Sequence, residues 1–321
     1  MLPIRDINPS RNFPVVNSTL IGINVVIFLV QMSMGSEANR FIYVYGLVPA
    51  RYTISHVSSY FTPFQQIFSF LSFMFLHGGF LHLLGNMWSL YIFGDNVEDR
   101  LGPFRYLLFY LLCGLASGIS HLALNLNSNI PTIGASGAIA GVMGAYLLLH
   151  PRSRILTLIP IIIFPWFVEI PAFFFIGIWF ALQLLNAAGS QGAGGIAWWA
   201  HIGGFVFGII FLKMALKVPS SGVSQKISPI TTRKKTSRLQ VIRPSGPPND
   251  PNLYGTLVIS AFEARSGSRK LVNIPWGYQK RLINVRVPAG IREGKILKLK
   301  SLGKLTPTGG RGDLLLKVTI K

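Results

Sequence analysis

The chain has 321 residues, half of them hydrophobic, and a formal net charge of +20. Only 12% of the residues are charged, about half the share found in soluble globular domains, so the composition excludes one large soluble domain. Residues 1–217 hold 10 Lys/Arg and 6 Asp/Glu, whereas residues 218–321 hold 20 and 4. The first part therefore carries +4 and the second +16, which predicts two parts in different solvents. The single cysteine, Cys113, excludes an intrachain disulfide and has no metal-site spacing.

The first part contains apolar runs that are long enough to cross a bilayer, for which a helix needs about 20 residues. Two further apolar stretches, 66–76 and 157–166, fit no simple span, because a Gly pair ends the first and two prolines interrupt the second. We expect 66–76 to be a re-entrant or interfacial piece, and seven spans remain an alternative to six. The six transmembrane helices that we predict lie at about 19–34, 79–97, 103–124, 134–150, 168–187 and 197–216.

The positive charges of the first part predict its orientation. In a six-span topology the basic residues at the span ends gather on one side, which the positive-inside rule assigns to the cytoplasm. The opposite loops, near 125–133 and 187–196, contain no Lys or Arg. We therefore expect both termini in the cytoplasm and, since no long transit segment precedes the first span, a multi-pass protein of the cell inner (plasma) membrane. The residues that gather are Arg5, Arg11, Arg100, Arg105, Arg152, Arg154, Lys213 and Lys217.

The second part divides again by composition. Residues 218–253 are rich in Ser, Pro, Thr and basic residues, which predicts a flexible linker. Its basic run, 233–235, is expected near anionic lipid headgroups, and nucleic-acid binding is the weaker interpretation, so we expect no nucleic-acid partner. Residues 254–321 show short Val/Ile/Leu runs separated by Gly and Pro. That pattern predicts a small antiparallel β domain.

Four polar side chains inside apolar runs are candidate functional groups, because polar groups in a membrane are costly. Ser136 begins the fourth predicted span, and His201 lies near the start of the sixth. His82 and Asn86 lie early in the second span and, four residues apart, share one helix face. The topology brings all four to the non-cytoplasmic side.

The residue types at these positions predict acyl-transfer chemistry. G-x-x-x-G patterns at 137–141 and 204–208 would let the fourth and sixth helices approach closely. His201 would then take the proton of Ser136 as the serine attacks a peptide carbonyl, while His82, Asn86 and backbone N–H groups stabilise the negative charge. No acidic residue falls near Ser136, so we predict a dyad without Asp. A serine that only bonds its own helix is the alternative.

Three motifs in this part resemble those of the rhomboid family of intramembrane serine proteases: FLHGGFLHLLGNMWSLYIFG at 75–94, GASGAIAG at 134–141 and HIGGFVFG at 201–208. The resemblance covers residues 65–215 and implies a six-helix bundle around a water-accessible cavity. It also implies Ser136 as nucleophile and His201 as base, with His82, Asn86 and the Ser136 amide at the oxyanion site and Gly134 in the same motif.

This likeness implies transmembrane protein substrates in the bilayer, and no cofactor or metal. Two features depart from the pattern. Ala140 stands where some members carry a Tyr that stacks on the catalytic histidine, and loop 35–65 lacks their Trp-Arg pair. A non-catalytic rhomboid-like membrane chaperone or escort is the alternative function, which the intact Ser136 and His201 disfavour.

Residues 254–321 resemble the peptide-binding C-terminal β domain of DnaJ-type co-chaperones. The resemblance rests on EARSGSRKLVNIP at 263–275, VRVPAGIREGKILKLKSLG at 285–303 and GDLLLKV at 312–318. It implies binding of extended or unfolded peptide at a sheet edge. A domain that only stabilises or anchors the chain is the alternative, and the chain has no His-Pro-Asp signature of a J-domain. The predicted fold is therefore an α-helical polytopic membrane protein followed by a small soluble all-β domain.

Overall fold

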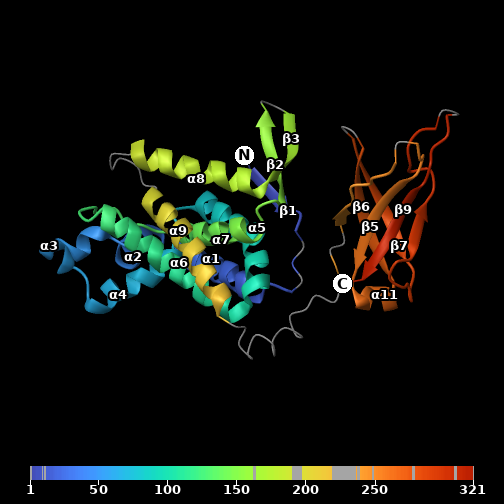
Figure 1. Ribbon diagram of the computed structural model, residues 1–321. Coiled ribbons are helices and arrows are strands. Elements are labelled where there is room, and N and C mark those ends of the chain that lie inside the picture. Colours follow the sequence, from blue (N-terminus) through green and yellow to red (C-terminus); the bar gives the residue numbers. More distant parts are fainter. Residues whose placement is uncertain are drawn as a thin grey trace. The chain divides into compact units, whose positions relative to one another are not determined.

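The structure is a computed structural model that divides into two compact units, Met1–Thr231 and Thr232–Lys321 (Figure 1). The basic run 233–235 and residues 190–196 of the predicted loop 187–196 lie outside the described residues. Those described are 2–8, 10, 12–161, 164–189, 197–218, 236, 239–247, 249–276, 279–306 and 309–320.

The first unit is a bundle of apolar helices. At its centre lies α7, which packs against α5, α6, α8 and α9 (Figure 1). Every residue of α7 from Gly137 to Tyr146 is buried. The long helices are α1 (Val15–Ser33), α5 (Phe80–Leu101), α6 (Pro103–Leu124), α7 (Ser136–Leu149), α8 (Ala172–Gly189) and α9 (Trp198–Lys217). The chain between α1 and α5 forms η1 (Gly35–Glu37), α2 (Ala38–Tyr45), η2 (Pro49–Tyr52), α3 (Ser55–Ser58), α4 (Pro63–Ser72) and η3 (Phe73–Phe75).

The helices differ in whether each is long enough to cross a bilayer by itself. Of the described helices, α1, α6, α8 and α9 are each long and apolar enough to cross a membrane alone. Helix α5 meets the same test together with α4 and η3, from which it is bent by 76°. With 14 residues, α7 is shorter than a full span, which needs about 20. Because α7 is enclosed by other helices, it can begin deeper in the membrane than the point at which its neighbours reach water.

Two predicted helices begin later than the sequence pattern indicated. Residues 168–171 of the predicted span 168–187 belong to a strand, and α8 starts at Ala172. Pro171 explains this, because a residue before proline is disfavoured in helical conformation and proline removes an N–H donor. The predicted span 134–150 becomes a helix only at Ser136, after Gly134 with a φ of +122°.

The apolar stretch 157–166, which fits no simple span, forms part of a small sheet. Strands β2 (Arg154–Ile161) and β3 (Phe164–Pro171) form an antiparallel hairpin in which Pro160 and Pro165 are partners. The N-terminal strand β1 (Leu2–Asp6) pairs with β2. The hairpin of β2 and β3 connects α7 to α8, and it accommodates in strands the prolines that exclude a helix here.

The second unit consists of two three-stranded sheets and one short helix, α11 (Ala261–Ser266). Its apolar core includes Leu257, Val272, Val285, Leu316 and Val318. The sheet orders are β4-β6-β7 and β5-β9-β8. The strands are β4 (Leu239–Val241), β5 (Leu253–Ile259), β6 (Ser268–Trp276), β7 (Gln279–Val287), β8 (Ile296–Leu299) and β9 (Leu314–Ile320).

The second unit is mainly β, as predicted, but it is not purely antiparallel. The pairs β4 with β6 and β5 with β9 are parallel. Strand β4 also falls inside the predicted linker 218–253, and Ile242 beside it is 4% exposed in the core. Pairing of strands that are distant in the chain depends on tertiary contacts, which the local Gly and Pro pattern does not encode.

A buried ion pair joins two elements of the second unit. Lys270 Nζ lies 2.6 Å from Glu263 Oε1, and both side chains are 2% exposed. Glu263 Oε2 also accepts hydrogen bonds from the hydroxyl of Thr236 and the amide of Ser260. The pair is thus surrounded by partners that compensate its burial.

We expect Glu263→Ala to destabilise the second unit by about 3–5 kcal/mol, because it leaves the Lys270 ammonium buried without its counter-charge. Lys298→Ala is the matched control: Lys298 pairs with Asp313 at 2.8 Å but is 59% exposed, so its loss should cost at most about 1 kcal/mol. Hydrogen exchange of the β6 and β9 amides in the full chain measures both values. Equal losses for the two variants would contradict a special role for the buried pair.

Candidate functional site

The side chains of Ser136 and His201 meet across two helices. Ser136 is the first residue of α7, and His201 lies in the first turn of α9. The distance between Ser136 Oγ and His201 Nε2 is 2.7 Å, which is a hydrogen bond between residues 65 positions apart. This is the geometry in which an imidazole can take the proton of an attacking serine.

Close contact between α7 and α9 makes this distance attainable. A Cβ added to Gly204 would lie 2.0 Å from the carbonyl oxygen of Gly137, and one added to Gly208 would lie 2.4 Å from Cα of Gly141. Side chains at these positions would force the backbones apart. The G-x-x-x-G patterns at 137–141 and 204–208 thus face each other, as small residues do where helices touch.

A third polar side chain completes the surroundings of the imidazole. Gln183 Oε1 on α8 lies 2.7 Å from His201 Nδ1. The Gln183 amide nitrogen donates to the carbonyl of Trp179, 3.2 Å away. The indole rings of Trp179 and Trp198 each lie 6.1 Å from the His201 ring, between centroids. These contacts hold His201 although Ala140 offers no ring to stack on it.

The predicted oxyanion residues lie around the turn that precedes Ser136. A Cβ on Gly134 would stand 2.8 Å from Nε2 of His82 and 3.7 Å from Nδ2 of Asn86. Asn86 is 7% exposed, and its Nδ2 has no hydrogen-bond partner within the described part of the chain. Gly134 therefore contributes the absence of a side chain, which leaves His82 and Asn86 close to the start of α7.

The proton on His82 can be assigned from its neighbour. The amide N–H of Gly78 points at His82 Nδ1, 3.3 Å away, so Nδ1 accepts. In a neutral ring the proton is then on Nε2, the nitrogen that faces Gly134. Together with the amide nitrogen of Asn86 and the backbone N–H of Ser136, which has no partner within α7 because it is in the first turn, the site offers three donors.

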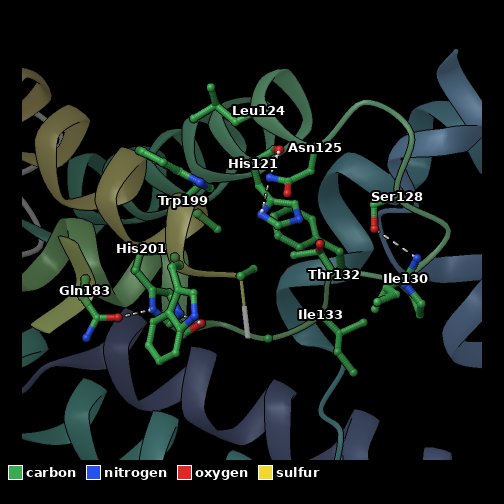
Figure 2. A pocket seen from close by; sticks show the side chains of 18 of the residues that line it. His121, Leu124, Asn125, Ser128, Ile130, Thr132, Ile133, Gln183, Trp199 and His201 are labelled. Carbon is green, nitrogen blue, oxygen red and sulfur yellow. Dashed lines mark hydrogen bonds between the residues drawn. The ribbon is translucent and has the colours of Figure 1, made fainter. Parts of the chain in front are cut away.

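A cavity of about 1040 Å³ lies against Ser136 and His201 (Figure 2). Its size matches the upper range of ligand pockets and gives room for a segment of extended peptide together with water. Polar and aromatic groups converge on it from α5, α6, α7, α8 and α9. They include His82, His121, Ser136, Trp179, Gln183 and His201.

Three residues of this cavity, Gln183, His121 and Trp179, are not among the site residues predicted from the sequence. Gln183 is a polar residue in the otherwise apolar α8, a signal that the cost of burying polar groups could have raised. His121 lies on the cavity wall, and its carbonyl accepts a hydrogen bond from Asn125 at 2.9 Å (Figure 2). For Trp179, the sequence offers no signal beyond its aromatic side chain.

His77 differs from the other histidines of this region. It is fully buried, and its backbone N–H and carbonyl are bonded to the side chain of Gln31 on α1. Its ring lies 5.1 Å from that of His82, between centroids. The side chain of Gln31 thus holds the backbone of the turn before α5. Among the described residues, no three His, Cys, Asp or Glu side chains are grouped as metal ligands would be.

Comparisons with known proteins show what the helical unit is similar to. The model of the Rhomboid domain matches residues 64–218. The chain is 36% identical over 149 residues to RHOMBOID-like protein 6, mitochondrial, of Arabidopsis thaliana. This aligned region covers 46% of this chain and 44% of that protein. It is 28% identical over 201 residues to Rhomboid protein 1, mitochondrial, of Saccharomyces cerevisiae, covering 60% and 51%. It is 33% identical over 153 residues to Rhomboid protease GluP of Bacillus subtilis, covering 47% and 26%.

The matches span about half or less of the length of these relatives. The residues that the family model matches include Ser136, His201, His82 and Asn86. The observed bundle of apolar helices agrees with the family model. Residues 64–218 are therefore similar to a rhomboid domain.

Proposed function

We propose that this protein is an intramembrane serine endopeptidase that cleaves transmembrane proteins with Ser136 and His201. The observation that carries the proposal is the 2.7 Å hydrogen bond between Ser136 Oγ and His201 Nε2 beside a large cavity. The similarity to the Rhomboid domain supports it, as does the name of one relative, Rhomboid protease GluP. A binding protein without catalysis would have no need of this pair.

The chemistry follows from the atoms present. Ser136 Oγ bonds to the carbonyl carbon of a substrate peptide as its proton passes to His201 Nε2. The negative oxygen that forms lies toward His82 Nε2, Asn86 Nδ2 and the Ser136 N–H. The C–N bond then breaks, and His201 gives its proton to the leaving amine. Water from the cavity attacks the acyl ester, with His201 again taking the proton, and this step releases a carboxylate and restores Ser136.

The substrate class follows from where the pair lies. An intact helix hides its peptide carbonyls in hydrogen bonds, so a substrate helix must unwind before one reaches Ser136. We expect single-span proteins with small or helix-breaking residues near the cleaved bond. Proteomics of released membrane fragments, from cells with the wild type or with Ser136→Ala, tests this. Identical fragment sets would reject the proposal and favour the non-catalytic escort.

For the second unit we propose capture of extended peptide at a sheet edge. Strand β8 pairs only with β9 among the described strands, and along it Ile296 is 52% exposed. Lys295, Lys298 and Lys300 lie on or beside this strand, which favours acidic peptides. An added strand would bond through backbone groups that β8 leaves open, and its charge would match the lysines.

We expect deletion of 218–321 to slow cleavage of membrane substrates that carry long cytoplasmic tails, and to leave tail-less substrates unaffected. The reason is that tethering a tail raises the effective concentration of the substrate at the membrane unit, by up to about 100-fold for a flexible link. Cleavage rates of paired substrates, with and without an acidic tail, measure the effect. The same rate change for both would mean that the unit only stabilises the chain.

The membrane placement is multi-pass, but the compartment is part of the proposal. The charge pattern predicts both termini in the cytoplasm, and the expected location is a plasma membrane. The names of two relatives place those proteins in mitochondria. A mitochondrial membrane is therefore the alternative location for this chain. Fractionation of cells that make a tagged chain, followed by protease protection of each terminus, distinguishes these arrangements.

A further inference from the structure

We infer that Gln183 is a positioning residue that holds His201 in the protonation and orientation that activate Ser136. The inference rests on the proposed function and extends it to a residue outside the predicted dyad. Its basis is the 2.7 Å distance between Gln183 Oε1 and His201 Nδ1 (Figure 2). The other ring nitrogen of His201, Nε2, faces Ser136 Oγ.

The orientation of the Gln183 amide is fixed by its second contact. An amide has one acceptor oxygen and one donor nitrogen, and the nitrogen donates to the carbonyl of Trp179, which can only accept. The oxygen of Gln183 must therefore face His201. Because an oxygen accepts, His201 Nδ1 must carry the proton that it donates to Gln183.

The tautomer of His201 follows directly. A neutral imidazole carries one proton, and if Nδ1 holds it, Nε2 has a free lone pair. Nε2 is the atom that faces Ser136 Oγ, so it can accept the serine proton. In the other tautomer Nε2–H would face the hydroxyl, and the ring could not act as a base. Gln183 thus performs the orienting task that an acidic side chain performs in a Ser-His-Asp triad.

A neutral amide suits the surroundings of this ring. Gln183 is 6% exposed on an apolar helix, and Trp179 and Trp198 flank the ring that it bonds. A carboxylate here would be a buried charge without a cationic partner whenever His201 is neutral, and such a charge carries a desolvation cost. Gln183 provides the acceptor oxygen without that cost.

A purely structural role for Gln183 makes the opposite prediction for two variants. Gln183→Met retains length and apolar packing but removes the acceptor oxygen, whereas Gln183→Glu retains an acceptor and adds a buried acid. If Gln183 only packs, Met is harmless and Glu is damaging. If it positions His201, Met is damaging and Glu retains function.

The first readout is catalytic. In the full chain we expect Gln183→Met to lower kcat for a single-span substrate by about 10- to 100-fold, the scale of a small misplacement of a reacting group, with KM changed less than about twofold. Gln183→Glu should stay within about tenfold of the wild type. Asn186→Met is the matched control, because Asn186 lies on the same helix, is exposed, and bonds the carbonyl of Leu182 in its own helix. Met equal to wild type, or Glu worse than Met, would overturn the inference.

The second readout does not require activity. In a chain with ¹⁵N-labelled histidine, we expect the wild type and Gln183→Glu to show His201 with a protonated Nδ1 and Gln183→Met to lose that signal; His201→Ala identifies it. A wild type with the proton on Nε2 would overturn the inference regardless of activity. A wild type that holds Nδ1–H but cleaves nothing would uphold the positioning and reject the proposed protease.

Discussion

Ser136→Ala is expected to abolish covalent labelling by a fluorophosphonate probe and to lower the cleavage rate by about four to six orders of magnitude. The alanine has no oxygen to form the acyl ester, and loss of a serine nucleophile removes nearly all catalysis by its whole group of residues. The change deletes one atom at the first position of α7, so the fold should be unaffected. Gel fluorescence and cleavage of a purified single-span substrate measure the two effects.

Ser89→Ala provides the matched control for this prediction. The Ser89 hydroxyl lies on the exposed side of α5 and bonds the carbonyl of Gly85 in its own helix at 2.8 Å. Its removal should change neither labelling nor cleavage. If Ser136→Ala labels as strongly as the wild type, another nucleophile reacts with the probe and the proposed mechanism is wrong.

The second large effect is expected from Gly204→Ala, although this residue reacts with nothing. Its new Cβ would lie 2.0 Å from the carbonyl oxygen of Gly137, a backbone atom that can move only with α7. The helices must separate, and the hydrogen bond between Ser136 and His201 lengthens. We expect a loss of about 100-fold in kcat and a destabilisation of about 1–3 kcal/mol. Cleavage rates and the thermal midpoint in detergent measure these.

Gly177→Ala is the control for the glycine variant. It makes the same chemical change in the middle of α8, where a Cβ meets no atom within 4 Å. Activity should be unchanged, and the helix should gain slightly in stability because alanine favours helix over glycine. Equal activity of the two alanine variants would mean that α7 and α9 can accommodate the added Cβ without separating Ser136 from His201, and this would contradict the prediction.

The helical unit could be anticipated from the sequence because its signals are local. Apolar runs give helices, and for 103–124 the predicted range coincides with α6. Where the prediction of helix ends differed, as at residues 168–171, the cause was a proline that the hydropathy pattern does not register. The functional assignment of Ser136, His201, His82 and Asn86 remains a prediction, although the structure brings these residues together.

The arrangement around His201 shows what local signals miss. Gln183 stands 18 residues before His201 on another helix, and nothing in its neighbourhood of the sequence distinguishes it from a glutamine that bonds its own helix. Asn186, on the same helix, bonds the carbonyl of Leu182 in its own helix. Gln183 is buried whereas Asn186 is exposed, and that difference depends on how the helices pack.

The sequence by itself determined the membrane character of residues 1–217, the small residues that allow two helices to touch, and the polar groups that the membrane makes costly. These follow from transfer free energies and side-chain size, which each residue carries wherever it lies. Only the tertiary structure decided that α8 supplies the partner of His201 Nδ1, and that β5 and β9 run parallel. Both depend on contacts between segments distant in the chain, whose pairing is set by the packing of the whole unit.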